Sequence, residues 1–371
     1  MPEKRARKLA ALASLPIVLL FAGCSQQSAA PAAGNSATAR PASTFSGDAT
    51  VPSAVDKSLK VALVVRTTQG GWLEDYTKTV QTEVTALGGT LHLYDSQNDL
   101  SKMASNVSTA VTSGVDILLV DNGTKAALAR PVEAALAKKI PVVAYDSDFT
   151  QAGVGSINQD DKALATESVA AIAKDFNGKA NIVVLSVAGY TPLDNRLAAL
   201  KAYTAAHPGI KIVAQTGTVS GNSSLDTQAQ VQALLKAHPG QGAINAIWTD
   251  WNDFSVGAAL ALKAENRSDV KLYTVDLTDQ NLPYFWGADT QLEAAAASNP
   301  ETIAISQVRL AYQKAAGANV GNLTVEPVVV TRSGLPKASF SYSQLSTYVP
   351  GWSTSATVWP AWIQTLENKH T

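Results

Sequence analysis

The chain has 371 residues, 46% of them hydrophobic, and its formal net charge is only -1. This length is enough for two ordinary domains, and the balanced charge, with no basic patch, argues against nucleic acid as a partner. The single cysteine, Cys24, excludes a disulfide framework, and the four histidines lack the spacing of metal ligands. No motif of a serine hydrolase, a zinc protease or a P-loop occurs, so we expect no metal or other cofactor.

Residues 1–24 have the three-part layout of a secretory signal peptide: a basic start, an apolar run over 9–22, and small residues before Cys24. The run is shorter than the ~20 residues that a membrane span needs. The ending "FAGC" resembles the lipobox of bacterial lipoproteins, although Phe21 stands where that motif usually has Leu. This implies that Cys24 is acylated and becomes the new N-terminus. The alternative is an ordinary signal peptide with an incidental cysteine.

Residues 25–57 are rich in Ser, Ala, Pro, Gly and Thr and show no helical or strand period. This composition predicts a flexible tether that holds a folded body away from a membrane surface. Each buried methylene of an acyl chain on Cys24 would add ~0.8 kcal/mol to the membrane anchor. No later run of ~18 apolar residues follows, so we expect membrane attachment through the lipid alone.

From residue 58 onward, short apolar runs alternate with helical patterns. "KVALVV" (60–65) is typical of a buried parallel strand, and residues 72–89 place apolar side chains at helical spacing. Further strands are predicted at 91–96, 115–120, 140–146, 181–186, 209–215, 243–248, 270–276 and 290–297. This alternation predicts an α/β fold of two doubly wound parallel sheets. Ligands bind such sheets outside the carboxyl ends of the strands, so the residues after each strand are candidates for a site.

Several ordered stretches resemble the ribose- and galactose-type periplasmic binding proteins, the substrate-capturing subunits of bacterial sugar ABC importers. These stretches are "LVVRTTQGGWLEDY", "LHLYDSQND", "GVDILLVDN", "IPVVAYDSD", "NIVVLSVAGYTPLDNRLAAL", "AINAIWTDWNDFSVGAALAL" and "LYTVDLTDQN". The resemblance implies the type I fold, in which two lobes joined by a three-segment hinge close on a ligand. It implies an N-terminal lobe of 58–159 plus 299–324 and a C-terminal lobe of 160–298 plus 325–371. The implied ligand is a sugar or polyol, and the implied partners are a membrane permease and its ATPase.

The resemblance also implies which residues hold the ligand. Asp146 and Asp276 end predicted strands and match ligand-binding aspartates, and Arg196 matches an arginine that opens a helix toward the cleft. Trp72 falls where the family places an aromatic ring over the ligand. Carboxylates accept from sugar hydroxyls, arginine donates in a fixed fork, and rings cover the C–H faces. The structural alternatives are turn or cap aspartates, a solvated helix arginine, and a tryptophan packed under a loop.

Trp251 departs from the family, which usually has a small polar amide at about this position. Together with Trp72 it would sandwich a flat or ring-shaped ligand. Asp250, Asn252 and Asp253 crowd beside it. We expect one or two of them to face the ligand and the others to cap a helix that starts at Asp253.

Two serines also depart from the family pattern. Ser298 stands where the family often has a ligand-binding Gln or Asn, and Ser147 replaces a second arginine. Ser298 therefore remains a candidate ligand residue, but the departures weigh against assigning pentose or hexose specificity. The family also captures polyols, quorum signals and other small polar molecules.

A segment at the C-terminus runs past the usual end of the family. It holds Trp352, Trp359 and Trp362, three of the seven tryptophans. We expect an extra strap packed across the hinge or the C-terminal lobe. The alternative is a strap that reaches the cleft and supplies another aromatic wall.

Together these features predict an exported binding protein, not an enzyme, that captures a small polar ligand by hinge closure and presents it to an ABC importer. An alternative is a tethered sensor for a chemoreceptor or a histidine kinase, because the fold serves both roles. An exported sugar isomerase or hydrolase would need an acid/base pair, and Asp250 with Asp253 is the only close acidic pair near the predicted cleft.

Overall fold

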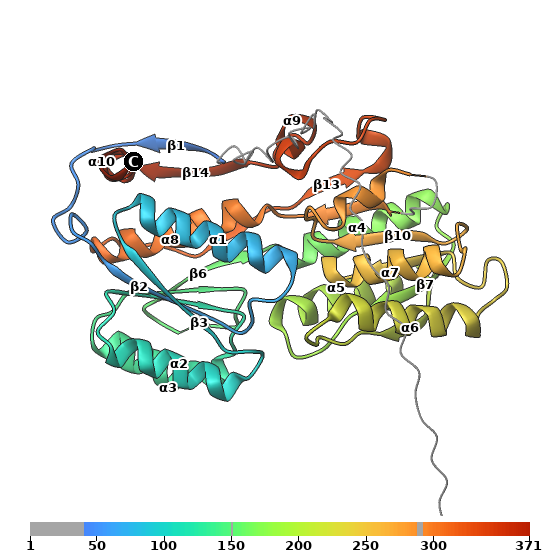
Figure 1. Ribbon diagram of the computed structural model, residues 1–371, viewed down its shortest axis with the longest axis horizontal. Helices are drawn as coiled ribbons and strands as arrows, with labels where there is room; N and C mark the ends of the chain where they lie inside the picture. Colours follow the sequence, from blue (N-terminus) through green and yellow to red (C-terminus); the bar gives the residue numbers. More distant parts are fainter. Residues whose placement is uncertain (1–40, 150, 288–291) are drawn as a thin grey trace, which may run out of the picture. The chain divides into compact units, whose positions relative to one another are not determined.

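The computed structural model describes residues 41–149, 151–287 and 292–371, so the predicted signal peptide and Cys24 lie outside the described residues. Two six-stranded sheets with helices on both faces form the core of the described chain (Figure 1). Their strand orders are β12-β6-β5-β4-β2-β3 and β13-β11-β10-β9-β7-β8. Neighbouring strands in both sheets are parallel, apart from the antiparallel pair β11 and β13. The predicted α/β fold with two parallel sheets is confirmed.

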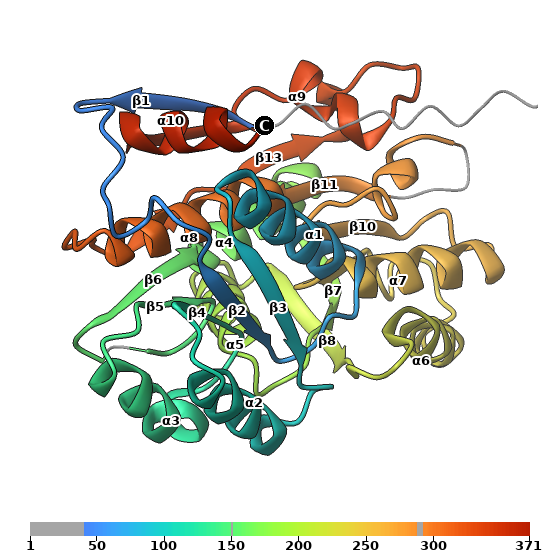
Figure 2. The same ribbon diagram turned by 60° about the vertical axis from the view of Figure 1, so that its left-hand side comes forward.

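The first sheet forms the N-lobe. Its strands are β2 (Lys60–Val65), β3 (Thr90–Asp95), β4 (Ile117–Asp121), β5 (Val142–Tyr145), β6 (Val154–Gln159) and β12 (Leu323–Val325). Helices α1 (Gly71–Ala86) and α8 (Pro300–Ala315) pack on one face. Helices α2 (Leu100–Thr112) and α3 (Lys125–Ala137) pack on the other face (Figure 2). Strands β4 and β5 are buried at every position, as expected for a parallel sheet covered on both sides.

The second sheet forms the C-lobe. Its strands are β7 (Ala180–Leu185), β8 (Ile210–Thr216), β9 (Ala246–Thr249), β10 (Lys271–Val275), β11 (Leu292–Ala297) and β13 (Val328–Thr331). Helices α6 (Ser223–Ala237) and α7 (Asn252–Ala264) pack on one face, together with the short α9 (Leu345–Tyr348). Helix α4 (Asp161–Asp175) packs on the other face, and α5 (Thr191–Ala206) joins it through Leu200.

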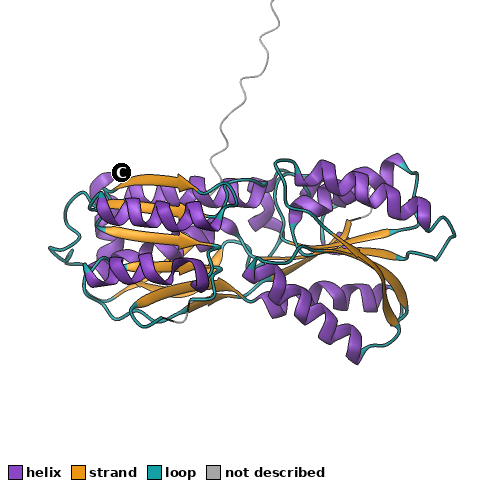
Figure 3. Ribbon diagram, turned by 90° about the horizontal axis from the view of Figure 1, so that it is seen from below, coloured by secondary structure: helices purple, strands orange, loops and turns teal. Residues whose placement is uncertain are grey.

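The chain passes between the two sheets three times (Figure 3). The crossings lead from β6 to α4, from β11 to α8, and from β12 to β13. Strands β12 and β6 form one edge of the first sheet, and β13 and β11 form one edge of the second. Each of the three crossings starts from one of these two edges. We call this side of the molecule the hinge end, and the opposite side, with β2, β3, β7 and β8, the outer end.

The predicted tether is wrong for its last part, because Ala42–Ser46 forms a strand, β1. It pairs in parallel with β14 (Thr354–Pro360), in a two-stranded sheet separate from the two large ones (Figure 1). Val55, also assigned to the tether, is fully buried in the N-lobe core. Local composition did not reveal this strand, because its pairing partner lies at the other end of the chain.

The predicted packing of the C-terminal strap on the hinge or the C-lobe holds only for its beginning. Trp352 packs in the C-lobe core. Trp359 and Trp362 instead pack in the N-lobe core, together with Ile363 and Leu366 of α10 (Ala361–His370). The strap therefore runs from the C-lobe to the N-lobe, and none of its residues lines the ligand cavity described below.

A buried arginine joins β1 and α10 to the N-lobe. Arg309 of α8 donates from Nε to Glu83 at 2.9 Å and from Nη2 to Glu367 of α10 at 2.7 Å. Its Nη1 donates to the hydroxyl of Ser43 in β1 at 2.6 Å, and its guanidinium carbon lies 5.5 Å from the centre of the Trp359 ring. One side chain thus joins α1, α8, β1, β14 and α10.

In the part of the chain that the structure describes, no helix has the length and apolar character to cross a bilayer.

Candidate ligand-binding site

A cavity lies between the lobes at the carboxyl ends of their strands. It is lined by Thr67, Trp72, Leu73, Asn122, Tyr145, Asp146, Gln159, Tyr190, Pro192, Leu193, Arg196, Val219, Trp251 and Asp276. Water molecules can place their centres in about 60 Å³ of this cavity. The cavity therefore admits one small molecule.

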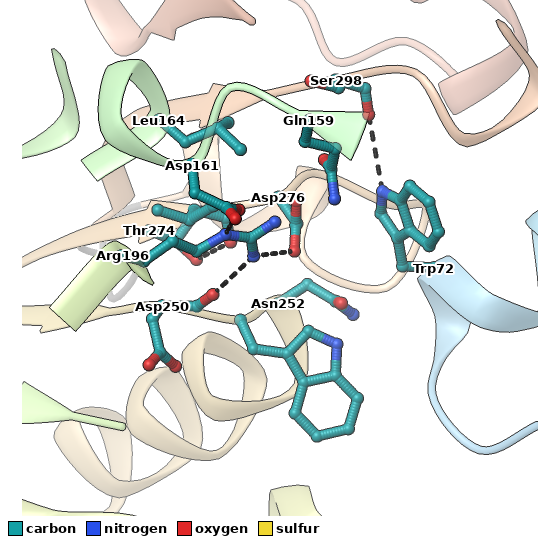
Figure 4. Close-up of polar contacts among 12 residues, drawn as sticks. Trp72, Gln159, Asp161, Leu164, Arg196, Asp250, Asn252, Thr274, Asp276 and Ser298 are labelled. Atoms are coloured by element: carbon teal, nitrogen blue, oxygen red, sulfur yellow. Dashed lines mark hydrogen bonds and ion pairs between the residues drawn. The ribbon is translucent and has the colours of Figure 1, made fainter. Parts of the chain in front are cut away.

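Arg196 organises the polar part of this cavity. Its Nε donates to Asp161 at 2.9 Å, and its Nη1 donates to Asp276 at 2.9 Å and to the backbone carbonyl of Asp250 at 2.9 Å (Figure 4). Burial alone would lower the pKa of Arg196, but the carboxylates of Asp276 and Asp161 outweigh it and raise that pKa. The guanidinium is therefore charged and held in one orientation, as recognition of a hydroxylated ligand requires.

Asp146 and Asp276 occupy equivalent positions in the two lobes. Asp146 follows β5 with φ 43°, and Asp276 follows β10 with φ 68°. This left-handed conformation is uncommon, and aspartate tolerates it better than most residues. The backbone of each residue still hydrogen-bonds to the neighbouring strand of its sheet. The Asp146 N–H donates to the carbonyl of Ile157, and the Asp276 N–H donates to the carbonyl of Ala296. The same turn thus brings a carboxylate from each lobe to the cavity.

The polar part of the cavity holds buried acceptors without donors. Gln159 donates from Nε2 to Asp146 at 2.9 Å and to the Tyr145 hydroxyl at 2.9 Å, which orients its amide. Among the described residues, neither Gln159 Oε1 nor Asp276 Oδ1 has a hydrogen-bond partner. Burial raises the pKa of Asp146, and Arg196 and Gln159 oppose that shift. Hydroxyl groups of a ligand can donate to all three side chains, which removes the cost of leaving them unpaired.

Trp72 belongs to a stack of three aromatic rings. Its ring centre lies 5.7 Å from the ring centres of both Tyr76 and Tyr145, and those two centres are 5.1 Å apart. The indole N–H donates to the carbonyl of Ser298 at 3.4 Å (Figure 4). The Tyr76 hydroxyl donates to Asp121 at 2.7 Å, and burial raises the pKa of Asp121 to about 7. The Trp72 ring, which lines the cavity, is thus held in place by its stacking on Tyr76 and Tyr145.

Residues of the two lobes meet at the outer end of the cavity. Arg66, after β2, donates to the carbonyl of Gly189 in the C-lobe, and its guanidinium carbon lies 3.6 Å from the centre of the Tyr190 ring. The Tyr190 hydroxyl donates to Asn98 of the N-lobe at 2.5 Å. The structure is therefore that of a closed cleft.

A second contact between the lobes involves the glycine pair before Trp72. A Cβ atom placed on Gly70, which has φ 98°, would lie 2.6 Å from the ring of Trp251. The carboxylate of Asp253 lies 3.1 Å from the same Cβ position, and burial raises the pKa of Asp253 to about 6. Asp253 thus faces the start of α1 from the opposite lobe. Our expectation that α7 starts at Asp253 is wrong by one residue, because the helix begins at Asn252 after Trp251.

Comparison with known proteins gives the family of this fold and site. The profile described as "Periplasmic binding protein domain" matches residues 61–319. The chain belongs to the periplasmic binding protein family. It is a binding protein rather than an enzyme, and such proteins work outside the cytoplasm. The match starts after β1 and ends before β12, β13 and the strap.

Individual members of the periplasmic binding protein family share about a quarter of the sequence. The ribose import binding protein RbsB of Salmonella typhimurium is 27% identical over 262 residues, 70% of this chain and 86% of its own length. The crystal structure of a sugar ABC transporter protein from Yersinia enterocolitica has a TM-score of 0.83 and 28% identity, covering 88% of this chain and all of its own. A 5-methylthioribose transporter solute binding protein from Thermotoga lettingae, in complex with 5-methylthioribose, has a TM-score of 0.81 and 29% identity, covering 86% of this chain and all of its own.

Five of the eight predicted ligand-binding residues line the cavity of this periplasmic binding protein: Trp72, Asp146, Arg196, Trp251 and Asp276. The other three do not. The Asp250 carboxyl is fully buried, with a pKa that burial raises well above its usual range, and only its backbone carbonyl reaches Arg196.

Asn252 and Ser298 support neighbours of the cavity. Asn252 donates from Nδ2 to Asp253 at 2.8 Å, and Ser298 accepts from Trp72 through its carbonyl. Sequence reasoning missed Gln159, which directly precedes the lobe boundary expected at residue 160. It also missed the apolar lining residues Leu193 and Val219.

Proposed function

We propose that this protein captures one sugar or polyol molecule in the cavity between its lobes and delivers it to an ABC importer. The observation that carries the proposal is the fixed array of Arg196, Asp276, Asp146 and Gln159, which offers a charged donor and two acceptor atoms without partners among the described residues, Asp276 Oδ1 and Gln159 Oε1. Such an array matches a ligand that carries several hydroxyl groups. The relatives named for ribose import and for 5-methylthioribose transport support the same class of ligand.

Closure of the cleft is the proposed mechanism of capture. Asp146 and Trp72 act from the N-lobe, and Arg196 and Asp276 act from the C-lobe, so a ligand that binds both pairs favours the closed form. A ligand shifts this balance only by the difference between its affinities for the two forms. The closed surface is then the shape that a permease recognises.

We also propose that Cys24 carries the lipid that anchors the protein to the cell envelope, with the chain before β1 as the tether. Radiolabelled palmitate fed to cells that express the full chain should label the protein. The Cys24→Ser variant should carry no label and should fractionate away from membranes. Equal labelling of both proteins would refute the anchor.

The ligand is tested by a thermal-shift screen followed by calorimetry on the purified chain, with ribose, xylitol, 5-methylthioribose and other pentoses, hexoses and polyols. We expect at least one compound to bind with one-to-one stoichiometry. Arg196→Ala and Asp146→Ala should each weaken that binding by ~1–3 kcal/mol, the cost of a buried polar group left unpaired. Lys201→Ala, on the exposed face of the same helix α5, is the matched control and should not change it. No binding by any sugar or polyol would refute the proposal.

A further inference from the structure

The cavity has two chemically different ends, and the strand order identifies them. In the first sheet β6 and β5 lie toward the hinge end, and in the second sheet β10 does, next to β11. Gln159 ends β6, and Asp146 and Asp276 follow β5 and β10. All three line the cavity, and Figure 4 shows Gln159 and Asp276 near Arg196. The charged and amide groups that suit hydroxyls are thus gathered at the hinge end.

The outer end of the cavity is lined by different residues. Leu193 lies in the first turn of α5, which follows β7, and Val219 follows β8, the edge strand of the second sheet. Leu193 and Trp251 belong to one hydrophobic cluster of the C-lobe, and the partly buried Val219 packs against it. Leu73, in the first turn of α1, adds an apolar side chain from the N-lobe. Four apolar side chains from four separate segments therefore converge on one end of a cavity whose other end is polar.

Two polar groups of the cavity near this apolar wall, the hydroxyls of Tyr190 and Thr67, already have partners inside the protein. The Tyr190 hydroxyl donates to Asn98 at 2.5 Å, and the Thr67 hydroxyl accepts from the N–H of Gln69 at 3.2 Å. A ligand hydroxyl placed against Leu193 and Val219 would lose its water partners and find few replacements. Burial of a polar group without a new hydrogen bond is unfavourable, whereas burial of an apolar group there is favourable.

We infer that the ligand is a sugar with an apolar substituent: its hydroxylated ring lies at the hinge end, and an alkyl or alkylthio group replaces one hydroxyl at the outer end. This inference rests on the proposed function, because it divides the same cavity into a polar part and an apolar part. The room for only one small molecule limits the substituent to a few heavy atoms.

The test compares two ligands that differ only at that position. Calorimetry with ribose and 5-methylthioribose on the full chain should show at least ~10-fold tighter binding of the methylthio sugar, the usual effect of filling a hydrophobic pocket. Equal affinity, or tighter binding of ribose, would overturn the inference and leave the proposed function intact. Failure of both sugars and of every other sugar and polyol would overturn the proposed function itself.

A substitution at Val219 tests whether the apolar side chains at the outer end cause the preference for 5-methylthioribose. Val219→Ser should lower the affinity ratio between 5-methylthioribose and ribose several-fold. Val213→Ser is the matched control, because Val213 lies on β8 just before Val219 and is 37% exposed outside the cavity. The affinity ratio between 5-methylthioribose and ribose in Val213→Ser should equal that of the unaltered protein. An unchanged ratio in Val219→Ser, with unfolding curves that show a folded protein, would refute the assignment of the outer end.

Discussion

The close approach of Gly70 to Trp251 allows a direct test of cleft closure. Gly70→Ala places a methyl group 2.6 Å from the Trp251 ring, where ordinary contacts are ~3.4–4 Å. Trp251 cannot move aside freely, since its ring packs edge-on against Phe254 with 5.5 Å between centres. Overpacking of this kind costs ~1–3 kcal/mol. Because the two residues belong to different lobes, this cost applies only to the closed form, and we expect Kd to rise ~5- to 150-fold.

The same substitution also strains the backbone, and a control variant separates this effect. Gly70 has φ 98°, which alanine adopts at a cost of ~1–3 kcal/mol in the open and closed forms alike. Gly114 has φ 75° in the same lobe, and a Cβ atom there meets nothing within 4 Å. Both alanine variants should therefore lose stability to guanidinium unfolding, but only Gly70→Ala should lose affinity in calorimetry. Equal Kd values for Gly70→Ala, Gly114→Ala and the unaltered protein would show that the bound form does not bring Gly70 against Trp251.

Three further predictions concern buried groups. Arg309→Met removes the buried guanidinium that pairs with Glu83 and Glu367, so the free energy of unfolding in denaturant should fall by ~3–5 kcal/mol, while Kd stays the same at temperatures where the variant is folded. Trp359→Ala should cost ~3–5 kcal/mol through the cavity it leaves in the N-lobe, and a Tm equal to that of the unaltered protein would contradict this packing. Burial in the closed cleft raises the pKa of Asp253 from 3.8 to about 6, so closing takes up a proton. Affinity should be higher near pH 5, by up to ~10-fold over pH 7.5, and should fall as the pH rises through 6. Asp253→Asn should remove that difference, and an identical pH profile for this variant would assign the titration to another group.

Much of the fold could be predicted because buried parallel strands are short apolar runs. The run "KVALVV" at 60–65 is strand β2 itself. Strand β6 was not predicted, because "VGSINQ" is half polar and its neighbours in the sheet are β5 and β12. Strand β1 was missed for another reason, since its pairing with β14 is set by contacts that no local pattern records.

The site could be predicted as far as the strand-end rule reaches. This rule and the family resemblance located Asp146 and Asp276, which both line the cavity. The rule places a residue at the correct edge of the sheet but does not give the direction of its side chain. Asp250 also follows a strand, and we expected it to face the ligand. Its carboxyl is instead buried away from the cavity. Gln159 was missed together with its strand. Val219 lies in a loop, where no period marks the direction of a side chain.

Arg309 joins β1 and α10, which lie far apart in the sequence, to the same lobe. This has a consequence for how the protein folds. Arg309 bonds Ser43 across 266 residues of sequence, and Glu367 joins the same group from the far terminus. Contacts so distant in sequence form slowly, because a long loop must close before they contribute. The first lobe to be synthesised can therefore be completed only after the C-lobe has been made, because it includes α10, which follows the C-lobe strands and helices in the sequence.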